Sequence, residues 1–137
     1  MKTPKHLAQE NARQWGSDIA RDRHRERMTI DEAAQTAGIS SGTLRLLEDG
    51  IGTVATYARC LDAYGDSRPH LTESIRAAAW DVYAMDRDSE GWATVLACMS
   101  ERRLRRLADG AGATMADVGA LVLVLGWADV IGRAISA

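Results

Sequence analysis

The sequence predicts an all-α protein, and three features of its composition support this prediction. Phenylalanine is absent, proline occurs only at positions 4 and 69, and alanine and leucine recur at three- and four-residue spacing. Few helix breakers combined with this periodicity are typical of amphipathic helices. A chain of 137 residues fits one domain, or one small domain with an oligomerisation element. We expect two helical parts, residues 1–66 and 67–137, with a linker at residues 66–69.

The N-terminal helices are marked by their capping residues. Thr3 is a candidate N-cap with Pro4 at the first helical position, and the polar helix that follows is expected to run through Gln14. Gly16 predicts a break, after which residues 17–27 form a charged and mostly solvated helix. The chain is therefore expected to begin with two helices.

Two short helices joined by a tight turn are expected next. Thr29 and Glu32 have the spacing of a capping box, which marks the start of the first of these helices. Gly38 predicts a left-handed stop, and Ser40 offers a new N-cap two residues later. The second short helix covers about residues 41–49.

The remaining helices follow from the spacing of apolar residues. One helix ends at Gly65, and Thr114 with Asp117 opens a last helix that runs to Ile131 and is apolar nearly all round. Between them, two further helices are predicted by the residues Leu71, Ile75, Ala78, Ala79, Val82 and Tyr83, and then by Trp92, Val95, Leu96 and Met99.

Several function classes find no support in the sequence. Cys60 and Cys98 are far apart and lack CxxC spacing or a nearby histidine pair, so we expect free thiols and neither a disulfide framework nor a zinc site. His6, His24 and His70 are isolated, and no glycine-rich phosphate loop or catalytic motif is present. We therefore expect no enzyme activity, no metal and no cofactor.

Location and net charge are less informative. The first ten residues are polar, without the apolar region of a secretory signal, and the most apolar stretch, residues 118–128, is too short to cross a bilayer. We expect a cytoplasmic protein. The formal net charge of −2 lacks the basic bias that would by itself indicate a nucleic-acid-binding protein.

The most specific pattern lies in residues 23–50, which include the run TIDEAAQTAGISSGTLRLLEDG. This pattern resembles the Xre/Cro-like helix-turn-helix domains of phage repressors and many bacterial regulators, and the resemblance covers about residues 15–65. It is carried by the small residue Ala34, the turn glycine Gly38, the core positions Ile39, Leu44 and Leu47, the pair Arg23 and Glu48, and Gly50 after the second helix. In the family, the arginine and glutamate form a buried pair that ties the first helix to the end of the recognition helix.

The resemblance implies a recognition helix that enters the major groove of double-stranded DNA. Arg45 is the strongest candidate for a base contact, since a guanidinium can bond guanine O6 and N7 together, although it would also suit a solvated surface. Ser40 and Thr43 suit phosphate contacts at a helix N-terminus, and Ser40 suits a structural cap equally well. The family's base-reading positions fall on Ser41, Gly42, Arg45 and Leu46.

A single helix-turn-helix contacts one half-site, so such proteins usually dimerise to span two half-sites about 34 Å apart. We expect residues 67–137 to supply this homodimer, because the last helix has more apolar surface than one buried face needs. The candidate residues are Leu121, Val122, Leu125, Trp127, Val130 and Ile131. A core helix within one chain is nearly as good an account, and an effector or partner pocket lined by Trp80, Trp92 and Trp127 is a third.

The expected function is therefore a dimeric repressor that reads an inverted repeat. The alternative is a helix-turn-helix protein-interaction module, such as an antitoxin or an antagonist of another regulator. Gly42, Leu46 and Ile51 suit this alternative, and Ile30 stands where the family often has a phosphate-binding glutamine. Four arginines at residues 102–106 are expected to pair with nearby acids, and phosphate contacts are the other option.

Overall fold

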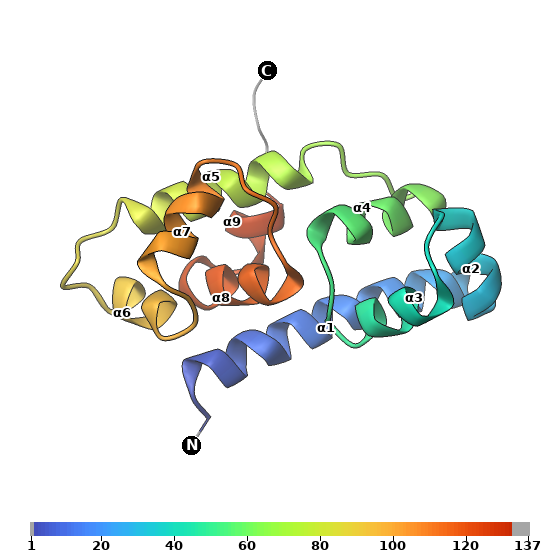
Figure 1. The fold of residues 1–137 in the computed structure, drawn as a ribbon, viewed down its shortest axis with the longest axis horizontal. Helices are drawn as coiled ribbons and strands as arrows, with labels where there is room; N and C mark the ends of the chain where they lie inside the picture. The colour runs from blue at the N-terminus through green and yellow to red at the C-terminus, as the bar shows by residue number, and fades with distance from the viewer. Residues whose placement is uncertain (1, 133–137) are drawn as a thin grey trace.

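The computed structural model describes residues 2–132, and within this range the chain forms nine helices and no strand (Figure 1). The all-α prediction is confirmed. None of the nine helices is both long and apolar enough to cross a membrane. The helices are α1 (Pro4–Arg25), α2 (Ile30–Ala37), α3 (Ser41–Glu48), α4 (Val54–Ala63), α5 (Leu71–Tyr83), α6 (Glu90–Leu96), α7 (Glu101–Ala108), α8 (Met115–Leu125) and α9 (Trp127–Ile131).

Two groups of four helices lie side by side (Figure 1). We call α1–α4 the first unit and α5–α8 the second unit; residues 65–70 join them. Within the first unit α1 packs on α3 and α4, and α1 also runs along α8 of the second unit. Within the second unit α5 packs on α6, α7 and α8, while α9 lies against α5 and α8.

Helix starts follow the predicted capping residues closely. Thr3, Thr29, Ser40 and Thr114 each accept a hydrogen bond from the backbone amide three residues later. The capping boxes of Thr29 with Glu32 and of Thr114 with Asp117 are both complete. Each cap bonds a backbone amide that the first turn of the helix leaves unpaired, and it contributes about 1 kcal/mol to stability.

The break predicted at Gly16 is wrong, because α1 continues through it from Pro4 to Arg25. Gly16 is buried where the end of α3 crosses α1. A Cβ atom there would lie 2.7 Å from the Glu48 carbonyl oxygen and 2.8 Å from the Gly50 amide nitrogen. The glycine serves close packing between two helices, and the helix tolerates the loss of about 1 kcal/mol in propensity.

The single last helix predicted from Thr114 to Ile131 is also wrong, because it divides at Gly126 into α8 and α9. Gly126 has φ 86° and ψ 162°, a backbone conformation open essentially to glycine alone. The Gly126 amide still donates a hydrogen bond to the Val122 carbonyl, so the last turn of α8 is complete before the chain changes direction.

Helix α8 is a core helix of the chain itself. Leu121, Val122 and Val130 are all at least nine-tenths buried, packed among the helices of one molecule. These three residues are therefore not available as a surface between copies, in contrast to the expectation for them. Of the residues expected at a dimer interface, Leu125, Trp127 and Ile131 remain partly exposed.

Candidate nucleic-acid interface

Helices α2 and α3 are joined by residues 38–40, and the turn is fixed by Gly38 at φ 72°. The Ile39 amide donates to the Ala34 carbonyl at 3.0 Å, which turns the chain back toward α2. Ala33, Ala34 and Ala37 are buried, so small side chains face the point where α2 meets its neighbours. Leu44 and Leu47 are fully buried on the inner face of α3.

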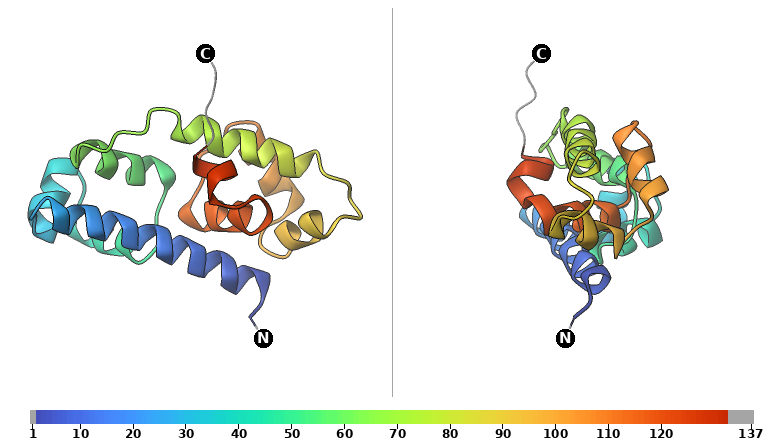
Figure 2. Two further views of the ribbon diagram at one scale, coloured as in Figure 1. Left: turned by 180° about the vertical axis from the view of Figure 1, so that it is seen from behind. Right: turned by 90° about the vertical axis from the view of Figure 1, so that its left-hand side faces the viewer.

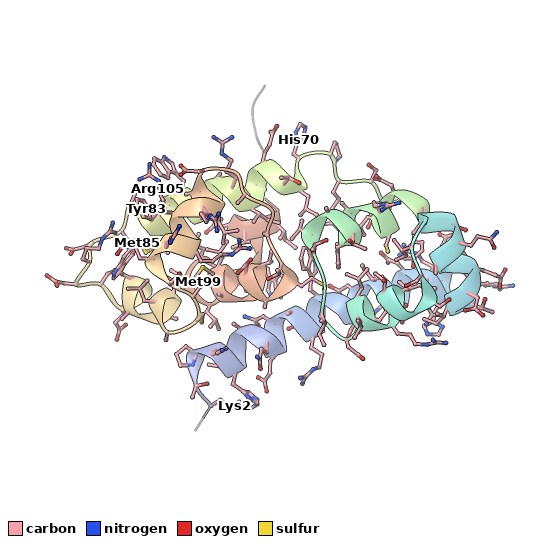
Figure 3. The ribbon with its side chains drawn as sticks, viewed as in Figure 1. Lys2, His70, Tyr83, Met85, Met99 and Arg105 are labelled. Carbon is pink, nitrogen blue, oxygen red and sulfur yellow. The ribbon has the colours of Figure 1, made fainter. Side chains whose placement is uncertain are left out.

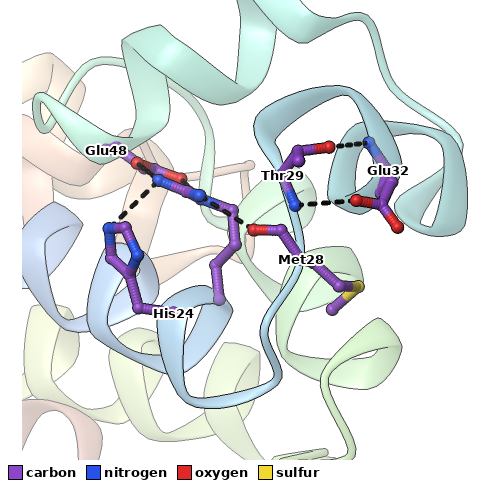
Figure 4. A network of polar contacts seen from close by, with 6 residues as sticks. His24, Met28, Thr29, Glu32 and Glu48 are labelled. Atoms are coloured by element: carbon purple, nitrogen blue, oxygen red, sulfur yellow. Dashed lines mark hydrogen bonds and ion pairs between the residues drawn. The ribbon is translucent and has the colours of Figure 1, made fainter.

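A buried ion pair ties α1 to the end of α3 (Figure 4). Arg23 Nε donates to Glu48 Oε2 at 2.8 Å and Arg23 Nη2 donates to Glu48 Oε1 at 3.1 Å. Arg23 Nη1 also donates to the Met28 carbonyl at 3.0 Å, which holds the chain just before α2. Hydrogen bonding to Glu48 raises the pKa of Arg23 above its ordinary value. The pair expected from the sequence is thus present, and it fixes three segments at once.

The outer face of α3 is left open by the rest of the described chain. Gly42, Thr43, Arg45 and Leu46 are exposed. Arg45 has neither an ion pair nor a side-chain hydrogen bond to any described residue. Its guanidinium is therefore free to meet a ligand.

The two serines at the start of α3 are already engaged. Ser40 Oγ accepts the Thr43 amide at 3.0 Å and donates to Thr43 Oγ1 at 2.8 Å. Ser41 is half-buried, and its hydroxyl donates to the Asp31 carboxylate of α2. Ser40 thus acts as a helix cap, and Ser41 braces α2 against α3.

Charges of both signs surround this face. Asp31 and Glu32 are exposed at the start of α2, and Arg59 donates to the Gly38 carbonyl at 3.1 Å in the turn. Ile51 follows α3 and is 59% exposed. The surface near α3 therefore carries both acidic and basic side chains together with exposed apolar ones, and it is not a basic patch.

The arginines of α7 divide into paired and unpaired groups. Arg103 donates to Asp117 at 2.6 Å, and Arg105 donates to Asp109 at 3.0 Å. Arg105 also lies over Tyr83, as Figure 3 shows, with 5.3 Å from its guanidinium carbon to the ring centre. Arg102 and Arg106 are exposed and form no ion pair or side-chain hydrogen bond within the described chain. The expected pairing with acids holds for two of the four.

The three tryptophans considered as one pocket lie in different places. Trp80 stacks on Tyr83 with 5.8 Å between ring centres, and Tyr83 meets Trp92 edge-on at 6.1 Å. Trp127 lies beside Trp15 of α1 instead, at 6.3 Å. A pocket lined by all three is therefore absent from the described residues.

Both cysteines are free. Cys60 is buried in α4, and burial raises the pKa of its thiol to about 11. Cys98 is only partly buried, and burial raises its pKa as well. Neither thiol is set up as a nucleophile at neutral pH, because the reactive form is the thiolate.

Comparison with protein-family models, with curated proteins and with solved structures found no match to this chain.

Proposed function

We propose that this protein is a sequence-specific regulator of transcription that binds double-stranded DNA and reads the major groove with α3. The observation that carries the proposal is the division of α3 into two faces. Leu44 and Leu47 are fully buried, whereas Gly42 and Arg45 on the other face are open. A short helix held rigidly from behind and open in front suits entry into the groove. Repression by blocking polymerase is the proposed outcome of binding.

Arg45 is assigned the principal base contact. Its guanidinium has no partner in the described chain, so binding DNA breaks no existing ion pair. A bidentate contact to guanine contributes about 1–3 kcal/mol of discrimination. Ser40 is occupied as a cap, so the phosphate contacts at this end are assigned to the backbone amides of α3 and to Thr43.

The proposal is tested by selecting bound fragments from random duplex DNA with the purified protein. The best fragment is then titrated with the wild-type protein, with Arg45→Ala and with the control Arg68→Ala, an exposed arginine in the linker. We expect Arg45→Ala to weaken binding to the selected fragment by about tenfold to a hundredfold. Arg68→Ala should bind like the wild type. If Arg45→Ala bound the fragment as tightly as the wild type, Arg45 would not be a base-contacting residue.

A protein-interaction module is the second candidate, and two observations favour it. Leu46 is 50% exposed and Ile51 59% exposed, which gives the end of α3 an apolar surface. The Asp31 carboxylate that holds Ser41 also lies near the start of α3, where it would repel phosphates. An apolar docking surface responds little to added salt, whereas DNA binding weakens steeply with salt. Failure to select any duplex at low salt would favour this candidate.

A homodimer remains a proposal, but fewer of the residues expected at its interface are available on the surface. The residues left for it, Leu125, Trp127 and Ile131, lie at the end of α8 and in α9. Helix α9 is on the face of the molecule opposite α3, as the two views of Figure 2 show. A two-fold dimer through this surface would turn the two α3 helices away from each other. Such a dimer is poorly suited to placing both on one duplex.

A further inference from the structure

The two units share a sequence pattern. When residues 40–50 are compared with the residues 60 positions later, the same amino acid recurs at several positions. The recurring pairs are Ser40 and Ser100, Leu44 and Leu104, Arg45 and Arg105, Leu47 and Leu107, Asp49 and Asp109, and Gly50 and Gly110.

The backbone follows the same repeat. Helices α3 and α7 are each eight residues long, and each begins after a serine cap and is followed by a glycine of positive φ, 86° at Gly50 and 101° at Gly110. Helices α4 and α8 each begin after a threonine cap and are followed by glycines of positive φ, 77° at Gly65 and 86° at Gly126. The order of elements in α1–α4 is thus repeated in α5–α8.

Part of the packing within the units corresponds too, although α2 packs on α3 whereas α6 has little contact with α7. Helix α5 lies on α7 as α1 lies on α3, and α6 lies on α8 as α2 lies on α4. At the same offset of 60 positions, Glu48 of the first unit corresponds to Ala108 of the second, which is buried. Because Ala108 carries no charge, the Arg23–Glu48 ion pair of the first unit has no counterpart at this position of the second.

The units are related by an approximate two-fold axis. Val54 N donates to the Ala113 carbonyl and Met115 N donates to the Gly52 carbonyl, both at 2.9 Å, so each unit gives and receives the same bond. In Figure 1, viewed close to this axis, α1 runs along the bottom and α5 along the top, with α2 and α6 at opposite ends. Helices α3 and α7 lie on the same face, turned toward the viewer in Figure 1 and away in the left view of Figure 2.

The outer face of α7 is more basic than that of α3. The positions that correspond to Gly42, Arg45 and Leu46 are all arginine in the second unit, namely Arg102, Arg105 and Arg106. Arg102 and Arg106 are exposed and unpaired within the described chain, which leaves two cations uncompensated by a neighbouring acid. Unpaired arginines on an exposed helix are suited to phosphate groups.

We infer that α7 is a second DNA-contacting helix, and that Arg102 and Arg106 bind phosphates of the same duplex that α3 reads. The inference rests on the proposed function, because it assumes that α3 meets a duplex. Its own support is the position of α7 on the same face as α3 and the charge of its open surface. One chain then contacts one duplex at two places, where an ordinary helix-turn-helix regulator uses two copies.

The test compares four proteins on the duplex selected by the wild type: wild type, Arg45→Ala, the double variant Arg102→Ala/Arg106→Ala and the control Arg68→Ala. Affinity is measured by fluorescence anisotropy at several salt concentrations, and hydroxyl-radical footprints are recorded. Circular dichroism checks that each variant is folded, which is expected because Arg102 and Arg106 have no partner to lose.

We expect the α7 double variant to lose about tenfold or more in affinity at low salt and to reduce the salt slope by about two, one for each phosphate contact. The wild type should protect two separate backbone segments with one chain bound per duplex, and the double variant only one segment. If the double variant matches the wild type while Arg45→Ala binds weakly, the α7 contact is overturned and the proposed function stands. If the wild type selects no duplex at low salt, the proposed function is overturned and the α7 inference with it.

Discussion

The Arg23–Glu48 pair shows how one residue choice organises the first unit. Arg23 reaches Glu48 on α3 and the Met28 carbonyl before α2, so a single guanidinium joins three segments (Figure 4). Its side chain is 10% exposed and that of Glu48 is 13% exposed, so the loss of one partner leaves the other charge with little access to water. The pair therefore fixes the position of α3 more than it adds net stability.

We expect Arg23→Met to lower the free energy of unfolding by about 3–5 kcal/mol, because Glu48 is then buried without a partner. The double variant Arg23→Met/Glu48→Leu should recover to within about 1 kcal/mol of the wild type, since no unpaired charge remains. Urea unfolding followed by circular dichroism measures both. If the double variant is as unstable as the single variant, Arg23 stabilises the fold through its packing or its Met28 contact and not through Glu48.

Elements defined by local signals were predictable from the sequence, whereas those defined by distant contacts were not. The capping boxes at Thr29 and Thr114 depend on residues three apart, and both are present. The role of Gly16 is set by the carbonyl of Glu48, far away in the chain, so a local pattern predicts a break there instead of a close helix crossing. The open face of α3 could be predicted because residues 23–50 resemble a known family pattern. The open face of α7 could not, because the sequence repeat that relates α7 to α3 is weak and becomes evident only from the similar packing of the corresponding helices.

At the crossing of α1 and α3, we expect Gly16→Ala to lower the free energy of unfolding by about 1–3 kcal/mol, because the added methyl group meets backbone atoms that cannot move aside. Gly42→Ala is the matched control on α3, where the nearest atom to a new Cβ is 3.9 Å away. It should raise stability by up to about 1 kcal/mol through helix propensity. Thermal and urea unfolding of both variants provide the measurement, and a stabilised Gly16→Ala would contradict the close crossing.

Across the whole molecule, the two units share one hydrophobic core and are not independent domains joined by a linker. Helix α1 of the first unit runs along α8 of the second, and a Cβ atom at Gly119 of α8 would meet the Ala8 carbonyl of α1. The Thr53–Thr114 bridge adds two backbone hydrogen bonds between the units. Neither unit therefore buries its apolar surface without the other.

We expect a single cooperative unfolding transition for the whole chain. Trp15 lies in the first unit and Trp92 in the second. A variant that keeps Trp15 as its only tryptophan reports on the first unit by fluorescence, and one that keeps only Trp92 reports on the second. The two fluorescence curves should coincide with each other and with circular dichroism. Two separate midpoints would mean that the units fold independently, contrary to the shared core.

The covalent joining of the two units also determines how binding would depend on concentration. A regulator that assembles from two separate chains loses its paired form on dilution, so occupancy of its site rises more steeply than in proportion to the protein. Here the reciprocal bonds at Thr53 and Thr114 lie within one chain, and the pairing of α3 with α7 is the same at every concentration. Site occupancy would then follow a simple hyperbola with a Hill coefficient of about one, and the two halves would be free to prefer different base sequences, so the site would have no need to be a palindrome.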